Sequence, residues 1–399
     1  MKMMETLSSS FILPKTAQLD ASQQKVINEI LKFSAQNISA PKTAIFILNG
    51  DAGAGKSIVL ASAFEKLQTL ARQKNTPFTG FDNKLLVNHN EMLKIYKELA
   101  PQSDYLYKKD FMKPTPFINH YHKIQQQADI VMIDEGHLLL TKDDPFNNFK
   151  QQNQLTEIMQ LAKIIIFVFD PQQVVKLKSY WQNDGLKNLL KDYPTKYYHL
   201  NQQYRVQNKN VTDWINAFTR GHLLEKPQIN NFDLEFFADG LPLYQKIQEK
   251  NKAVGLSRML ATADFPFTVL DDKTWFVTAG QLKLPWDKIN FTDRPWAERP
   301  ETIDEVGSIY TIQGFDLNYA GVILGPSVKY DEKTDKIYID SSLYEDHEAF
   351  KKRNDIPALN QAKDTIVMNS VNILLKRGKF GLYLYASDPI LRKHLLALN

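Results

Sequence analysis

Residues 50–57 read Gly50-Asp51-Ala52-Gly53-Ala54-Gly55-Lys56-Ser57, which is a complete phosphate-binding loop. An apolar run over 44–48 precedes it and predicts a buried strand, and apolar residues at helical spacing predict a helix over 57–73. The glycines let backbone N–H groups face an anion, and the helix N-terminus adds the positive end of its dipole. We therefore expect these eight residues to bind ATP, with Lys56 reaching the β/γ-phosphates and the Ser57 hydroxyl ligating Mg²⁺. A glycine-rich turn with a chance lysine does not account for all four fixed positions in this context.

A second acidic motif follows the apolar run 130–133 and reads Asp134-Glu135-Gly136-His137. The run predicts a central parallel strand whose carboxyl end points at the phosphate-binding loop. We expect Asp134 to hold Mg²⁺, and Glu135 to orient or deprotonate the attacking water. Lys56 and Asp134 are 78 residues apart (134 − 56), which leaves room for an intervening strand and its helices. The alternative is an acidic turn at the end of a strand.

Length and composition set the broad class. A chain of 399 residues with 43% hydrophobic and 24% charged residues is typical of a globular protein of two domains. The net charge of +4 means that any binding to nucleic acid requires a local basic groove. The absence of cysteine excludes disulfides and thiolate zinc sites. The start of the chain does not have the pattern of a signal peptide, and no apolar run reaches the roughly 18 residues that span a bilayer. We therefore expect a cytoplasmic protein that does not associate with membranes.

Strand-like and helical segments alternate along the chain, which predicts an α/β fold with parallel sheets. In the first half, strands are expected at 44–48, 84–88, 130–133 and 164–169. A second series is expected to start near 197–200 and to continue at 234–237, 253–256, 321–324 and 381–385. We expect a first, ATP-binding domain over 1–188 and a second domain over 189–399. The tryptophan- and proline-containing segment of about 264–300 predicts a small β-rich insertion in the second domain.

Five further segments occur in a characteristic order: Leu19-Asp20-Ala21-Ser22-Gln23, Phe169-Asp170-Pro171-Gln172-Gln173, Gln203-Tyr204-Arg205, Gln313-Gly314-Phe315-Asp316 and Leu374-Leu375-Lys376-Arg377-Gly378. With the phosphate-binding loop and the acidic motif, they resemble superfamily 1 helicases over about 19–388. Within that superfamily, the chain resembles the bacterial family related to the Schlafen helicase-like domain. The resemblance implies two RecA-like P-loop domains that hydrolyse ATP, with Mg²⁺, while acting on single-stranded DNA or RNA.

The resemblance also implies roles for single residues. Gln23 would pair with the adenine edge, Gln173 would link the γ-phosphate to the nucleic-acid groove, and Asp316 would bind the ribose. Arg205 and Arg377 would reach the γ-phosphate, where a planar guanidinium suits the charge that develops on the equatorial oxygens. Alternatives remain: Gln23 also fits a helix-capping box with Asp20, Gln173 fits a strand-end turn, and each arginine fits an exposed surface position.

Contacts with the nucleic-acid strand are expected from the segments Asn88-His89-Asn90 and Lys113-Pro114-Thr115-Pro116-Phe117, and from Arg258 at a strand end. Aromatic stacking combined with phosphate contacts is the expected mode. The alternative for the two segments is a structural role, and for Arg258 an exposed loop.

The function that these patterns predict is an ATP-dependent, helicase-like motor or translocase. An NTP-gated switch or scaffold is the non-enzymatic alternative, although Glu135 has the chemistry of a catalytic base. A small-molecule P-loop kinase is a third class, which the expected second domain disfavours.

Overall fold

The computed structural model describes residues 19–50, 55–145, 148–181, 184–200, 208–268, 273–286, 294–312, 315–351 and 353–399. The chain divides into two compact units. The first comprises residues 1–171 and 178–202, and the second comprises 172–177 and 203–399. The segment 172–177 therefore belongs to the second unit, although the residues on both sides of it belong to the first.

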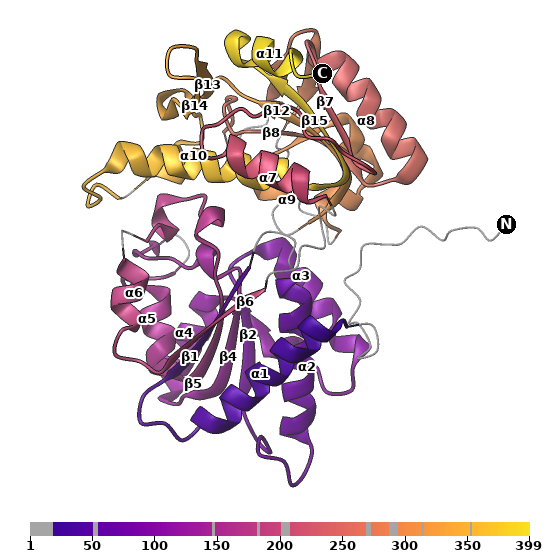
Figure 1. Cartoon of the computed structure of the whole chain (residues 1–399). Coiled ribbons are helices and arrows are strands. Elements are labelled where there is room, and N and C mark those ends of the chain that lie inside the picture. Colours follow the sequence, from indigo (N-terminus) through magenta and orange to yellow (C-terminus); the bar gives the residue numbers. More distant parts are fainter. Residues whose placement is uncertain are drawn as a thin grey trace, which may run out of the picture. The chain divides into compact units, whose positions relative to one another are not determined.

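The described part of the first unit contains a sheet of six parallel strands in the order β3-β2-β4-β5-β1-β6 (Figure 1). Its strands are β1 (Ala44–Gly50), β2 (Asn83–Val87), β3 (Phe111–Met112), β4 (Ala128–Asp134), β5 (Ala162–Val168) and β6 (Thr195–Leu200). The helices are α1 (Ala21–Asn37), α2 (Lys56–Arg72), α3 (Asn90–Glu98), α4 (Pro114–Ile124), α5 (Gln154–Leu161) and α6 (Gly185–Leu190).

Helices cover both faces of this sheet, which explains why its central strands are almost continuously apolar. Successive side chains of a strand point to opposite faces. On one face, Ile45, Val131 and Ile165 pack in a single core with apolar residues of α4, α5 and α6. Helices α1 and α2 pack together and contact other parts of the central strands. The carboxyl ends of all six parallel strands consequently meet at one edge.

Strand β6 corrects the predicted series of strands in the second half. The segment 197–200 was expected to open the second series of strands, but β6 pairs with β1 in the first sheet. Its burial alternates, as suits an edge strand, so its sequence alone does not show which sheet it joins. The first compact unit therefore includes β6.

The second unit contains a parallel sheet in the order β11-β8-β12-β15-β7 (Figure 1). These strands are β7 (Asp233–Phe236), β8 (Ser257–Ala261), β11 (Val306–Gly307), β12 (Leu317–Leu324) and β15 (Gly378–Ala386). The helices are α7 (Lys209–Phe218), α8 (Gly240–Val254), α9 (Ile309–Ile312), α10 (Leu359–Leu375) and α11 (Pro389–Leu396). The prediction of a strand at 253–256 was wrong, because α8 ends at Val254 and Gly255, at φ +70°, forms the turn before β8.

The expected insertion contains β9 (Phe276–Ala279) and β10 (Leu282–Pro285), which form an antiparallel hairpin. A second hairpin, β13 (Val328–Asp331) with β14 (Lys336–Ile339), follows β12. The chain therefore contains two RecA-like α/β domains with parallel sheets, and the second domain carries a small β-rich insertion.

Candidate functional site

The segment predicted to bind phosphate follows the carboxyl end of β1. Gly50 is the last residue of β1, and Lys56 is the first residue of α2. Gly55 caps the helix at φ +74°, a left-handed conformation that glycine adopts without a steric penalty. Lys56 Nζ donates a hydrogen bond to the carbonyl oxygen of Gly50 over 2.5 Å. The predicted phosphate ligands Asp51, Ala52, Gly53 and Ala54 lie outside the described residues.

Ser57 and Asp134 meet although they are far apart in sequence. Asp134 is the last residue of β4 and is 1% exposed, and the Ser57 hydroxyl lies close enough to its carboxylate to lower the pKa of that group. Burial and, next, the charge of Glu135 raise the pKa of Asp134 to about 6, although hydrogen bonds from Tyr96, Ser57 and the Glu135 backbone oppose the rise. A buried carboxylate beside a hydroxyl provides the hard oxygen donors that Mg²⁺ prefers, so these residues fit the expected metal.

Tyr96, on α3, also binds Asp134, and sequence reasoning did not identify it. Its hydroxyl donates to Oδ2 of Asp134 over 2.5 Å, and its ring stacks against Phe111 with centroids 6.0 Å apart. Burial, together with the charge and hydrogen bond of Asp134, raises the pKa of Tyr96 well above its usual range. The phenol therefore stays protonated and acts as a donor. The sequence carries no specific signal for this contact, because it depends on how α3 packs against the sheet.

Glu135 adopts a left-handed backbone conformation at φ +49°, which is strained for a residue with a side chain. Its Oε2 lies 2.8 Å from Nε2 of the buried His137. Gly136 lies between them in sequence, where an added Cβ would be 2.2 Å from the Phe167 ring. The acidic motif thus forms a tight turn that presents Glu135 beside Asp134. His137 is part of the motif, but its role as the partner of Glu135 was not predicted.

Gln23 occupies the capping box that the sequence allowed. The Asp20 backbone N–H donates to its Oε1 over 3.1 Å, and the Asp20 carboxylate accepts from the Ser22 and Gln23 backbones. This confirms the structural alternative, which is compatible with contact to adenine.

The last helicase-like segment, 374–378, spans the end of α10 in the second unit. Arg377 is 1% exposed and donates to the carbonyl oxygen of Phe315 over 3.0 Å. Because it is buried, the alternative of a solvated surface arginine is wrong. Asp316 lies 3.7 Å from the Lys379 ammonium, measured between Oδ2 and Nζ. The other predicted arginine, Arg205, lies outside the described residues, as do Gln313 and Gly314.

Gln173 is buried in a short 3-10 turn over Pro171–Gln173 and belongs to the segment 172–177. This segment is held to the second unit by side chains that sequence reasoning did not single out. Asn369 Nδ2 donates to the Val174 carbonyl over 2.9 Å, and Arg353 Nη1 donates to the Leu177 carbonyl over 2.8 Å.

Asn88, His89, Thr115 and Arg258, which were expected to contact nucleic acid, take part in structural interactions. Asn88 donates to the Leu138 carbonyl, and the His89 ring caps α3. The buried Thr115 hydroxyl accepts from Gln154. The exposed-loop alternative for Arg258 is wrong, because its guanidinium is buried and donates to Asn251, Thr302 and the carbonyls of Ser257 and Arg299.

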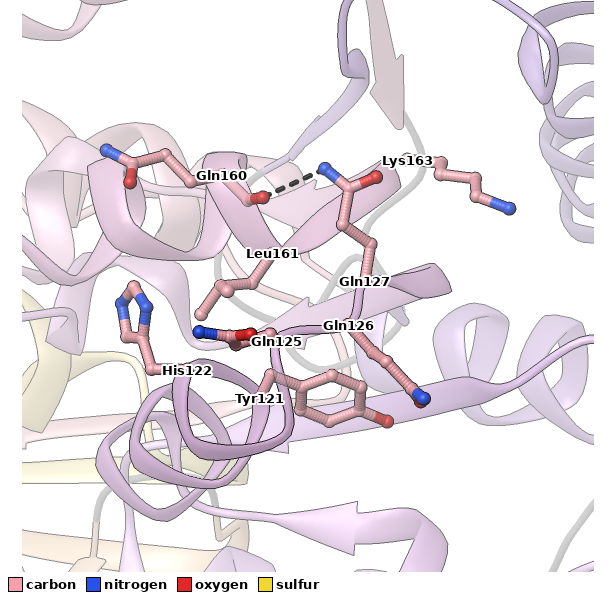
Figure 2. A pocket seen from close by; sticks show the side chains of 8 residues that line it. All are labelled: Tyr121, His122, Gln125, Gln126, Gln127, Gln160, Leu161 and Lys163. Carbon is pink, nitrogen blue, oxygen red and sulfur yellow. Dashed lines mark hydrogen bonds between the residues drawn. The ribbon is translucent and has the colours of Figure 1, made fainter.

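A polar depression of about 660 Å³ lies in the first unit, and Figure 2 shows the side chains that line it. Its lining includes Tyr121 and Lys163, and Gln127 donates to the Gln160 carbonyl there over 2.9 Å. It lies where β4 and β5 begin, so it is at the opposite ends of these strands from Asp134 and is separate from the phosphate-binding loop.

Comparison with known proteins identifies the family. Residues 43–388 match the family described as Schlafen group 3, DNA/RNA helicase domain. The chain belongs to this family. It is 41% identical over 413 residues to the Saccharomyces cerevisiae protein YPL245W, with 95% of this chain and 90% of the yeast protein covered. The bacterial origin suggested by the sequence resemblance is not supported, because this relative comes from yeast.

Two solved structures are similar to this Schlafen group 3 chain at low sequence identity. The Pif1 helicase from Candida albicans aligns at a TM-score of 0.38 and 11% identity, covering 94% of this chain and 96% of that one. A Saccharomyces cerevisiae Dbp5 variant bound to Gle1 and IP6 aligns at a TM-score of 0.37 and 11% identity, covering 95% and 89%. Across the part of the chain that the structure describes, no helix is both long and apolar enough to cross a membrane. The family match and the two sheets make this chain a helicase-like protein of the P-loop NTPase class.

Proposed function

We propose that this protein is an ATP-dependent, helicase-like motor or translocase that acts on single-stranded nucleic acid. The observation that carries the proposal is the meeting of the Ser57 hydroxyl with the buried Asp134 carboxylate, directly beside Glu135. A phosphate-binding loop alone indicates that a nucleotide binds. A metal-binding pair with an adjacent carboxylate supports hydrolysis as well.

In this proposal, ATP phosphates bind at the N-terminus of α2, where the loop residues from Gly50 to Ser57 supply backbone N–H groups and the Lys56 ammonium. Ser57 and Asp134 would hold Mg²⁺, which neutralises charge on the β- and γ-phosphates when it is bound. Gln23 would contact adenine and Asp316 the ribose, as the helicase resemblance implies.

Glu135 is the proposed base. It would orient a water molecule and accept its proton as the bond to the γ-phosphorus forms. His137 holds the Glu135 carboxylate at 2.8 Å, so the strained turn keeps this side chain in one orientation. Arg205 and Arg377 would stabilise charge on the equatorial oxygens, and Gln173 would couple the γ-phosphate to strand binding.

The family description supports the nucleic-acid part of the proposal. The helicase-like segments 50–57 and 134–137 at the strand ends also support it. The segments after β2 and β3 are the proposed contact points in the first unit. Lys113 at the start of α4 is half-buried there, and this burial lowers the pKa of its ammonium. A cytoplasmic location, as expected from the sequence, belongs to the same proposal.

One assay tests the proposal: the ATPase rate of the full chain, measured alone, with single-stranded DNA, with single-stranded RNA, and with small-molecule acceptors. Stimulation by either polymer supports a motor or translocase. Tight ATP binding with negligible turnover under all conditions indicates the switch or scaffold. Transfer of phosphate to a small acceptor indicates a kinase, although the second parallel sheet disfavours that class.

A further inference from the structure

The side chain of Asp134 is held at both oxygens. Tyr96 donates to Oδ2 over 2.5 Å, and the Glu135 backbone N–H donates to Oδ1 over 2.9 Å. Two donors on different oxygens define the plane of the carboxylate and prevent it from rotating. A carboxylate offers about four lone-pair sites, so these contacts, even with the nearby Ser57 hydroxyl, leave acceptor capacity for a cation.

The hydrogen bond from Tyr96 to Asp134 is buried and held in place by packing. Both side chains are 1% exposed, so the Tyr96 hydroxyl donates to the Asp134 carboxylate away from solvent. The Tyr96 ring is fixed by stacking on Phe111, so the hydroxyl cannot move away without disturbing the core around β3. Tyr96 lies in the last turn of α3, outside every segment that resembles a helicase motif.

We propose that Tyr96 is a positioning residue that holds the Asp134 carboxylate in the orientation required to bind a divalent cation together with Ser57. This inference rests on the proposed function and deepens it by adding a residue that sets the affinity for the metal. Hydrogen-bonding partners of metal ligands typically change metal affinity or activity by about 10–100-fold when they are removed.

The chain supplies a matched control. Tyr121 on α4 is also a buried tyrosine of the first unit, and its hydroxyl donates to the carboxylate of Asp82. It lines the polar depression at the opposite ends of the strands (Figure 2), so it cannot contact the Asp134 carboxylate. Tyr96→Phe and Tyr121→Phe therefore remove the same kind of hydrogen bond and keep the same ring, but only the first removes a donor from Asp134.

The experiment measures binding of a fluorescent ATP analogue to the full-length protein, first in EDTA and then as Mg²⁺ or Mn²⁺ is added. The metal concentration for half-maximal ATPase and the melting temperature are measured on the same variants. For Tyr96→Phe we expect the metal concentration for half-maximal analogue binding to rise by about 10–100-fold. Its analogue affinity in EDTA should match wild type, and Tyr121→Phe should have the metal dependence of wild type.

The inference would be overturned if Tyr96→Phe had the metal dependence of wild type and were destabilised only as much as Tyr121→Phe. Tyr96 would then be a structural residue. Equal shifts in metal dependence for both variants would also overturn it. Failure of the proposed function gives a different result, because the wild-type protein itself would then show no metal-dependent analogue binding.

Discussion

Nε2 of His137 lies 2.8 Å from Oε2 of Glu135, and the histidine is almost completely buried beneath the turn that follows β4. The left-handed backbone of Glu135 is stabilised by this pair and by the close packing of Gly136 on Phe167. A strained residue that is held by its surroundings is typical of functional sites. The relationship explains how a side chain at a strand end keeps one orientation, which the proposed role of Glu135 as a base would require.

Glu135→Gln should bind Mg·ATP with wild-type affinity but hydrolyse it about 10²–10⁴ times more slowly. The amide oxygen of glutamine can still accept a hydrogen bond from His137, so the turn should persist while the base is lost. Single-turnover hydrolysis and nucleotide titration measure the two effects separately. Loss of nucleotide binding in this variant would show that Glu135 is a metal ligand or a structural residue.

Lys56→Ala should abolish ATP turnover without unfolding the protein. Lys56 is the cation at the start of α2 that contacts the Gly50 carbonyl, and the phosphates would bind at this position. Lys66→Ala on the exposed side of the same helix is the control, and it should hydrolyse ATP at the wild-type rate. Undiminished hydrolysis by Lys56→Ala would eliminate the phosphate-binding assignment.

Gln23→Glu should separate the two roles of Gln23. Glutamate retains the oxygen that accepts from the Asp20 backbone, so the capping box and the melting temperature should be preserved. It loses the amide donor that would pair with adenine, and a bidentate base contact contributes about 1–3 kcal/mol of discrimination. The preference for ATP over GTP should therefore fall by about tenfold or more. An unchanged nucleotide preference would leave Gln23 with the capping role alone.

Arg377→Ala should lower ATP turnover on the order of 10³-fold with little change in nucleotide affinity, if Arg377 stabilises the transition state. Because Arg377 is buried, its loss should also lower the melting temperature. Lys376→Gln controls for this, since Lys376 is a neighbouring buried cation that donates to Asn216 over 2.7 Å. The Lys376→Gln variant should retain turnover at temperatures well below its melting temperature.

We expect Arg205→Ala to behave like Arg377→Ala. For either arginine, a loss of nucleotide affinity with unchanged turnover would exclude it from the transition state.

Single-stranded nucleic acid should raise the ATPase rate, and the stimulation should fall as salt increases. A chain with a net charge of +4 can bind a polyanion only through a local groove, and each neutralised phosphate releases counterions. Stimulation should also increase with strand length if both domains contact the strand. Steady-state rates over a series of salt concentrations and oligonucleotide lengths measure this. An ATPase rate that neither DNA nor RNA changes at low salt would favour the switch or scaffold.

Much of the fold could be predicted because its signals are local. Apolar runs that end in glycine or acidic residues identified β1 and β4, and the residues that follow them lie at the carboxyl edge as expected. The Asp20–Gln23 capping box was also predictable, since all its contacts lie within four residues. Gly55 and Gly136 occupy positions where a left-handed backbone or a nearby ring makes a side chain costly.

The sequence by itself therefore determined the α/β class, the phosphate-binding loop and the acidic strand end, because each depends on a short pattern of backbone conformation and polarity. The tertiary structure decided which sheet received β6, that Arg258 and Arg377 are buried, and that Tyr96 and Ser57 meet at Asp134. These outcomes depend on strand order and helix packing, which bring together groups that are 38 or more residues apart. Burial then determines the pKa of Asp134 and the hydrogen bonds that its carboxylate must accept.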